Sequence, residues 1–134
     1  MSPRFFSDET DLGLAKRLVK KLPGQVVYPG HSDLPEVPRG CRDDEWLNVI
    51  GNRRLVVITR DKRIRTRPVL NAKWVRFQVR GFVLTGRKNQ STEGSLAVLE
   101  MHWNRIEGYI QEHPSGPWMC SVTVKGIREV ALKR

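Results

Sequence analysis

The chain has 134 residues, of which 39% are hydrophobic and 28% charged, a composition that suits one globular domain and excludes a disordered chain, a collagen-like repeat and a coiled coil. Its 24 Lys and Arg residues exceed its 14 Asp and Glu residues, and the net charge of +10 favours a polyanionic partner, although a solvated basic surface is an alternative. No apolar run approaches the roughly 18 residues of a membrane span, and residues 1–8 lack a signal peptide's apolar region, so we expect a cytoplasmic protein with no membrane partner.

The first part of the chain alternates short apolar runs with an amphipathic stretch. The pattern predicts a strand at residues 4–7 and a helix that Asp11 caps and a Pro-Gly pair ends. A second strand is predicted at residues 25–28. The stretch 31–40 contains two prolines and no periodicity, so we expect a loop there.

The middle of the chain repeats this alternation. Three acids at 43–45 complement the dipole at the start of a second helix, and the β-branched run 55–59 predicts a strand that is covered on both faces. Thr66 and Pro68 are predicted to start a third helix, which Gly81 ends before a fourth strand at 82–85.

The last part begins with a longer helix that Ser95 is predicted to start. Two alternating runs at 118–124 and 127–132 flank Lys125-Gly126 and predict a β-hairpin. Strands that alternate with helices indicate an α/β fold, a mostly parallel sheet with helices on both faces. We treat residues 1–134 as one domain, with a core at about 4–113 and a C-terminal β-hairpin at 117–132.

Acidic residues follow two of the predicted strands. Asp8 and Glu9 come directly after the first strand, and Asp61 follows the 55–59 strand by two residues. The acids 43–45 begin the helix before that strand, so all of them can meet at the carboxyl edge of the sheet. Clustered carboxylates repel one another unless a cation joins them or some are protonated. Hard oxygen ligands favour Mg²⁺ or Mn²⁺, which can activate water and neutralise charge on a phosphodiester.

Each acid also has a structural interpretation. Asp8 could cap a turn, and Asp43 could be the N-cap of its helix. Asp44 could simply complement the helix dipole, and Asp61 could be an ion-pair partner within the basic run from Arg60 to Arg67. The cysteines, Cys41 and Cys120, lack the spacing of a zinc site and are expected to be free thiols.

Three segments around the acids resemble the PIN nuclease superfamily, and most closely its PIN-like branch of VapC-type toxins. They are Phe-Phe-Ser-Asp-Glu at 5–9, Asp-Asp-Glu-Trp-Leu at 43–47 and Val-Ile-Thr-Arg-Asp at 57–61, of which the Thr-x-Asp element is the most specific. The resemblance covers roughly residues 4–110. It implies a three-layer α/β/α sandwich that binds Mg²⁺ or Mn²⁺ and cleaves RNA.

By position, the resemblance implies that Asp8, Asp43 and Asp61 are catalytic metal ligands and that Thr59 orients a ligand or water. Two further acids are implied as secondary ligands, namely Glu9 and Asp44. Basic side chains are candidates for contacting RNA phosphates: Arg60, Lys62, Arg63, Arg65, Arg87 and Lys88. Many PIN nucleases carry a further acid on a middle helix, where this chain offers only Asp33 and Glu36.

The favoured function is a metal-dependent endoribonuclease, the toxin of a type II toxin–antitoxin pair. Its partners would be an RNA substrate, a cognate antitoxin protein and, since PIN-type toxins often form dimers, a second copy of the chain. One alternative is a non-catalytic RNA-binding module with the same fold. Another is a receiver-type phosphoacceptor domain, which also clusters acids but normally needs a lysine after a late strand, for which 85–88 is only a loose match.

Overall fold

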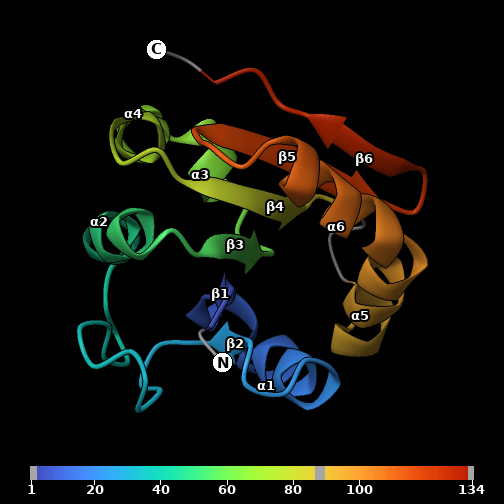
Figure 1. The fold of residues 1–134 in the computed structure, drawn as a ribbon, viewed down its shortest axis with the longest axis horizontal. Coiled ribbons are helices and arrows are strands. Elements are labelled where there is room, and N and C mark those ends of the chain that lie inside the picture. Colours follow the sequence, from blue (N-terminus) through green and yellow to red (C-terminus); the bar gives the residue numbers. More distant parts are fainter. Residues whose placement is uncertain (1–2, 87–89, 133–134) are drawn as a thin grey trace.

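The computed structural model describes residues 3–86 and 90–132, which form a six-stranded sheet with helices on both faces (Figure 1). The strands are β1 (Phe5–Ser7), β2 (Val26–Val27), β3 (Val56–Thr59), β4 (Arg80–Leu84), β5 (Trp118–Thr123) and β6 (Gly126–Glu129). They lie in the order β2-β1-β3-β4-β5-β6, and every neighbouring pair is parallel except β5 and β6. The predicted α/β class, the mostly parallel sheet and the C-terminal hairpin are therefore confirmed, and the hairpin extends the sheet.

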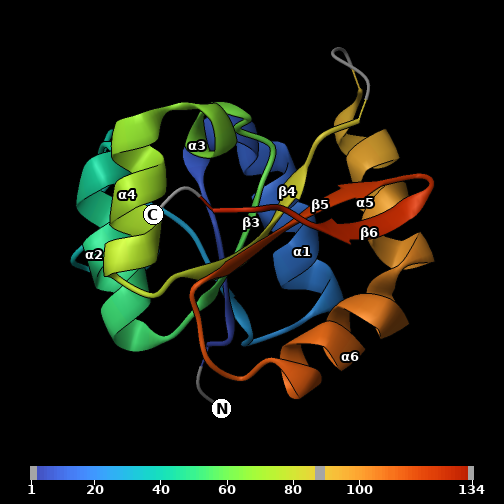
Figure 2. The ribbon, with the colours of Figure 1, turned by 90° about the horizontal axis from the view of Figure 1, so that it is seen from above.

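The helices complete three layers (Figure 2). One face of the sheet carries α1 (Leu12–Lys21), which follows a short 3-10 helix η1 (Glu9–Asp11), together with α5 (Thr92–Met101) and α6 (Trp103–Glu112). The other face carries α2 (Asp43–Arg53), α3 (Arg63–Thr66) and α4 (Pro68–Arg76). None of the helices within the described residues is both long and apolar enough to traverse a bilayer.

Each parallel strand supplies side chains to two separate cores. Successive strand residues point to opposite faces, so Phe6 and Val57 pack beneath α2 and α4, whereas Phe5 and Val56 pack beneath α1 and α5. Both faces of the central strands are covered, which is why these strands are continuous apolar runs in the sequence.

Three local predictions were wrong. The helix predicted from Ser95 is two helices, because α5 already begins at Thr92 under the Ser91 cap and the chain breaks at His102 before α6. Thr66 does not start the third helix but ends α3, a short helix that was not predicted. Gly81 does not end a helix but lies inside β4, where an added Cβ would come within 2.8 Å of Trp74 and Val57, so the close approach of Trp74 requires glycine.

The topology opens a crevice between β1 and β3. From the carboxyl end of β1 the chain turns to α1 on one face of the sheet, and from the carboxyl end of β3 it turns to α3 and α4 on the other face. Because these two connections diverge, the carboxyl ends of β1 and β3 are left uncovered between them. Ser7 is in register with Ile58, so the residues that follow the two strands emerge side by side at this edge.

Candidate metal centre

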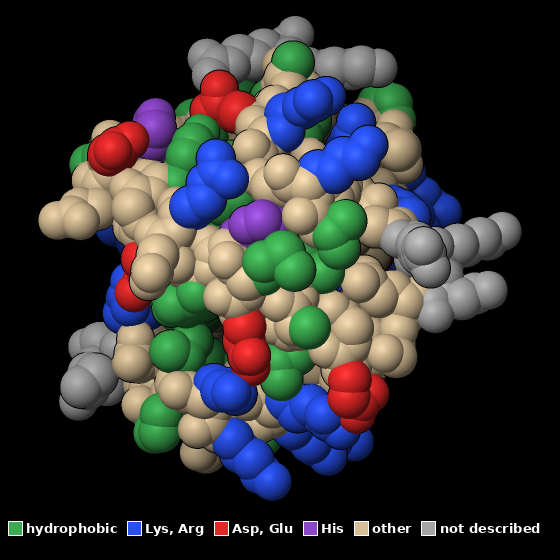
Figure 3. Space-filling view, turned by 90° about the vertical axis from the view of Figure 1, so that its right-hand side faces the viewer, with side chains coloured by type: hydrophobic (Ala, Val, Ile, Leu, Met, Phe, Trp, Pro, Cys, Tyr) green, Lys and Arg blue, Asp and Glu red, His purple; other side chains and the backbone are tan. Residues whose placement is uncertain are grey.

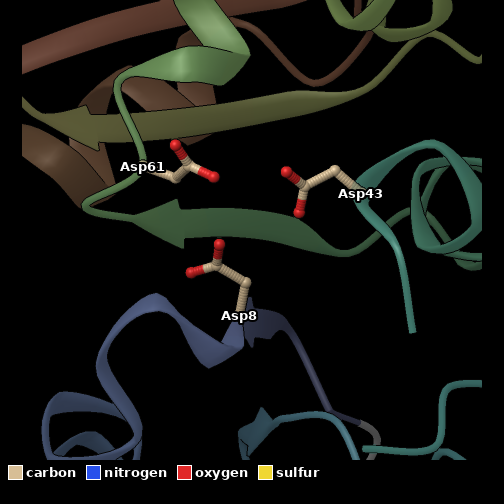
Figure 4. Close-up of side chains that lie close together, drawn as sticks. All are labelled: Asp8, Asp43 and Asp61. Carbon is tan, nitrogen blue, oxygen red and sulfur yellow. The ribbon is translucent and has the colours of Figure 1, made fainter. Parts of the chain in front are cut away.

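Three carboxylates meet at the carboxyl edge of the sheet (Figure 4). Asp8 follows β1, Asp61 lies two residues beyond β3, and Asp43 is the first residue of α2. One carboxylate oxygen from each residue lies within 4.8 Å of the others, and Asp8 and Asp61 are buried. The folded chain thus brings together the three aspartates that the sequence singles out.

Hydroxyl groups fix the carboxylate of Asp8. Thr59 Oγ1 donates to Asp8 Oδ1 at 2.9 Å and accepts from the backbone N–H of Asp61 at 2.9 Å. Thr10 Oγ1 donates to Asp8 Oδ2 at 2.8 Å. Thr59 therefore links the ends of β1 and β3, and its role in orienting a metal ligand or water stays a prediction. Thr10 was missed, because a threonine two residues after an aspartate is too common a pattern to single out.

Asp43 is held by a core tryptophan. The indole Nε1 of Trp46 donates to Asp43 Oδ1 at 3.0 Å, and the ring of Trp46 packs against Phe6 with the ring centroids 4.8 Å apart. The N-cap of α2 is Arg42, so the interpretation of Asp43 as the cap is wrong, and its carboxylate points toward those of Asp8 and Asp61 instead. Burial of the Trp46 ring in the core therefore orients a polar group at the surface.

Asp61 is engaged by an arginine of its own loop. The Arg63 guanidinium donates from Nε to Asp61 Oδ1 at 2.9 Å and from Nη2 to Asp61 Oδ2 at 2.8 Å. The backbone N–H of Arg63 also donates to Oδ1 at 2.9 Å. The interpretation of Asp61 as an ion-pair partner is thus confirmed, whereas its role as a metal ligand stays a prediction. The Asp61 side chain is buried, with 4% of its surface exposed, and it faces the other two carboxylates.

The electrostatics of the three carboxylates differ. Burial raises the pKa of Asp8 to about 7, with a further contribution from the charges of Asp43 and Asp61. Burial and the charge of Asp61 also raise the pKa of Asp43. Burial acts to raise the pKa of Asp61 as well, but the hydrogen bonds from Arg63 outweigh it and hold that pKa below its ordinary value. The raised pKa values of Asp8 and Asp43 indicate that the single guanidinium of Arg63 does not balance the charge of three carboxylates. The all-carboxylate donor set fits Mg²⁺ or Mn²⁺.

The centre opens into a cleft of about 710 Å³. Asp8 and Asp43 line it together with three arginines, Arg42, Arg63 and Arg67. Its apolar lining includes Pro29, Pro68, Val69 and Leu70. A phosphate group that enters this cleft would meet guanidinium groups on its way to the carboxylates. Arg42 and Arg67 were missed, although Arg67 ends the basic run that the sequence pointed to.

The secondary ligands and the further acid have other surroundings. Asp44 lines the cleft but forms ion pairs with Arg42 at 2.9 Å and Lys73 at 3.6 Å. Glu9 lies in η1, and its side chain is outside the described part of the structure. Glu36 pairs with Arg53 at 2.7 Å, so it belongs to a surface ion pair and not to the centre.

The predicted phosphate contacts divide into three groups. Arg63 lines the cleft, and Arg65 is exposed on the same helix. Lys62 is exposed and donates to the carbonyl of Gly86 at 3.1 Å, whereas Arg60 forms an ion pair with Asp11 at 2.6 Å and donates to the carbonyl of Gln90. The remaining two candidates lie outside the described residues, namely Arg87 and Lys88.

A protein-family model with the description "PIN like domain" matches residues 3–86. The match covers more than half of the 134 residues and includes all three aspartates of the centre. Neither the curated proteins nor the solved structures contain a match to the chain.

Proposed function

The chain belongs to the PIN-like domain family, and on that premise we propose that it is a divalent-metal-dependent endoribonuclease. The observation that carries the proposal is the cluster of Asp8, Asp43 and Asp61, which gathers three carboxylates at one cleft of a chain with net charge +10. PIN-like domains are commonly nucleases, and a carboxylate cluster is the donor set that phosphodiester hydrolysis with Mg²⁺ or Mn²⁺ uses.

The residues of the centre have separate roles in this proposal. Asp8, Asp43 and Asp61 would hold the ion, which when bound supplies Lewis-acid stabilisation and lowers the pKa of a bound water molecule. Thr59 keeps the carboxylate of Asp8 aligned with the loop that carries Asp61. The arginines of the cleft would attract the RNA backbone, and Glu9 and Asp44 stay predicted secondary ligands.

The finer function that we propose is that of a VapC-type toxin with a cognate antitoxin. The three segments around the aspartates support it, since they resemble that branch of the superfamily. Induced expression in a bacterial host should arrest growth, and the Asp8→Asn variant should not. Growth that is unaffected by the wild-type chain would contradict the toxin role without contradicting the nuclease.

A non-catalytic RNA-binding module is the second candidate. Asp33 and Glu36, the acids available in place of the further family acid, lie outside the carboxylate cluster of the described residues. Such a module would bind RNA with the same affinity in EDTA, in Mn²⁺ and after the change Asp61→Asn.

The test is an RNA cleavage assay with mixed RNA in Mn²⁺, in Mg²⁺ and in EDTA. We expect the wild-type protein to cleave only with metal, and Asp8→Asn and Asp61→Asn to be at least about 100-fold slower. Asp33→Asn makes the same chemical change at a side chain that is 68% exposed, and it should cleave like the wild type. Cleavage that persists in EDTA or in Asp8→Asn would overturn the proposal, and labelling by acetyl phosphate would point to the phosphoacceptor alternative.

A further inference from the structure

Arg63 already places a positive charge at the carboxylate centre. Its guanidinium forms a two-point contact with both oxygens of Asp61. This hydrogen bonding to Asp61, together with the charges of Asp61, Asp43 and Asp8, raises the pKa of Arg63. We propose that Arg63 is a tethered counter-ion that leaves Asp61 when a divalent ion binds and then contacts an RNA phosphate in the cleft. This inference rests on the proposed function, because it assigns a positioning residue to the same site.

Asp61 does not need the guanidinium to stay in place. The backbone N–H of Arg63 donates to Asp61 Oδ1, and the backbone N–H of Asp61 donates to Thr59 Oγ1. Both donors are main-chain N–H groups of the segment between β3 and α3, and neither bond involves the guanidinium. The side chain of Arg63 can therefore move away while the carboxylate keeps its position.

The oxygens of Asp61 cannot accept both side-chain hydrogen bonds of Arg63 and also coordinate a metal ion. An ionised carboxylate offers about four acceptor positions, and three hydrogen bonds from Arg63 reach these two oxygens. A divalent ion on the same oxygens would also repel the guanidinium. Binding of the ion is therefore expected to break the two side-chain bonds and to leave the backbone bond intact.

The surroundings of Arg63 favour its release into the cleft. The side chain of Arg63 is 59% exposed, whereas that of Asp61 is only 4% exposed. Because the guanidinium is already largely in contact with water, its separation from Asp61 costs little free energy. Arg63 lines the same cleft as Arg67, where a phosphate that approaches the centre must pass. A guanidinium is well suited to this contact, because its planar donors match phosphate oxygens.

The exchange links two binding events. If metal binding frees Arg63 for a phosphate, then a phosphate that engages Arg63 must in turn strengthen metal binding by the same factor. The protein without metal would hold RNA only weakly near the carboxylates, since the nearest arginine is bound to Asp61.

The first experiment is calorimetric titration with Mn²⁺ alone. Arg63→Gln removes the competitor, and we expect it to bind Mn²⁺ about fivefold more tightly than the wild type. Arg67→Gln removes the same charge from the same cleft, but the ion pair of Asp61 is with Arg63. Arg67→Gln should therefore change the Mn²⁺ affinity much less. Arg63→Lys keeps the charge and loses the two-point contact, so it should fall between the wild type and Arg63→Gln.

The outcomes separate the two proposals. Equal or weaker Mn²⁺ binding by Arg63→Gln, with wild-type binding intact, overturns the counter-ion role and leaves the nuclease untouched. A wild-type protein that binds no Mn²⁺ overturns the nuclease and the counter-ion role together. Thermal melting of each variant in EDTA shows whether the variant is folded. We expect Arg63→Gln to fold, because the backbone N–H of residue 63 still donates to Asp61.

A second experiment measures RNA binding. Fluorescence anisotropy with a labelled single-stranded RNA compares EDTA with Ca²⁺, an ion that carboxylates also bind. We expect Ca²⁺ to tighten RNA binding by the wild type and by Arg67→Gln, and the tightening factor to be about threefold smaller for Arg63→Gln. A tightening factor that is unchanged by Arg63→Gln would overturn the coupling.

Discussion

The properties of the centre depend most on single hydrogen bonds and on burial. Asp8 is 3% exposed, and hydroxyl groups of Thr10 and Thr59 contact its two oxygens. Neutral hydroxyl donors offset only part of the cost of burying a charge. The carboxylate is therefore poised to accept either a proton or a cation, which makes the centre sensitive to pH.

Asp8→Asn should change the pH dependence of stability in EDTA. The pKa of Asp8 rises from 3.8 to about 7 on folding, so the folded protein binds the proton more tightly and loses stability as pH rises through this window. The loss, on the order of 4 kcal/mol, should be complete above about pH 8. Asn cannot ionise, so the variant should melt at a higher temperature than the wild type at about pH 8 and similarly at about pH 4.

Asp33→Asn is the matched control for this measurement, since its side chain is 68% exposed. Its melting temperature should follow the wild type across the whole pH range. If the melting temperatures of Asp8→Asn and of the wild type changed with pH in the same way, Asp8 could not be a buried carboxylate whose charge lacks a compensating partner.

Thr59→Val should weaken both stability and Mn²⁺ binding. The variant keeps the shape of the side chain but removes the donor to Asp8 and the acceptor for the Asp61 N–H in a fully buried place. We expect a loss of about 1–3 kcal/mol in urea unfolding and a several-fold weaker Mn²⁺ affinity by calorimetry. Thr59→Ser keeps the hydroxyl and should retain most of both, so equal losses in the two variants would show that the hydroxyl is not the cause.

At the scale of elements, the sequence predicts what periodicity and capping control. It gives the start of α1 at Asp11, whose carboxylate accepts from the Leu14 N–H at 2.9 Å, and the start of α2 at its acids. It does not give the break at His102, because apolar residues continue at helical spacing through it. Nor does it give the bond from Trp46 to Asp43, which depends on how the Trp46 ring packs against Phe6.

Gly81→Ala should strongly destabilise the sheet. The added Cβ would lie 2.8 Å from Val57 of β3 and from the Trp74 ring of α4, so the helix or the strand would have to shift. We expect a loss of about 1–3 kcal/mol in urea unfolding. The control is Gly108→Ala in α6, where a Cβ has open space and should stabilise the helix by about 0.5–1 kcal/mol. A Gly81→Ala variant as stable as the wild type would contradict the close packing of α4 on β4.

At the scale of the whole molecule, the fold class and the meeting of the three aspartates were predictable because parallel strands share one carboxyl edge. Which basic residues form ion pairs within the protein was not predictable, because their partners are distant in the sequence. Arg60 pairs with Asp11, 49 residues away, and Arg4 pairs with Glu107, 103 residues away. The face that carries α5 and α6 mixes basic, acidic and apolar side chains (Figure 3), so the cleft arginines and not this face are the expected RNA contact.

The affinity for RNA in EDTA should therefore depend on salt concentration, because the arginines of the cleft are expected to contact RNA phosphates. The logarithm of the affinity should fall linearly with the logarithm of salt concentration, by about 0.7 for each phosphate contacted. Arg67→Gln should reduce the slope by about one contact, whereas Arg105→Gln on α6 should leave it unchanged. Anisotropy titrations over a salt series give these slopes. Equal slopes for Arg67→Gln and Arg105→Gln would contradict the cleft as the place where RNA binds.

The most direct measurement is anomalous scattering from crystals soaked in Mn²⁺ at a pH above the pKa of Asp8. We expect an anomalous peak within bonding distance of carboxylate oxygens from Asp8, Asp43 and Asp61, with the guanidinium of Arg63 turned away from Asp61. Crystals of the folded protein that show Mn²⁺ elsewhere, or none between these three side chains, would contradict the assignment of this cluster as a metal centre.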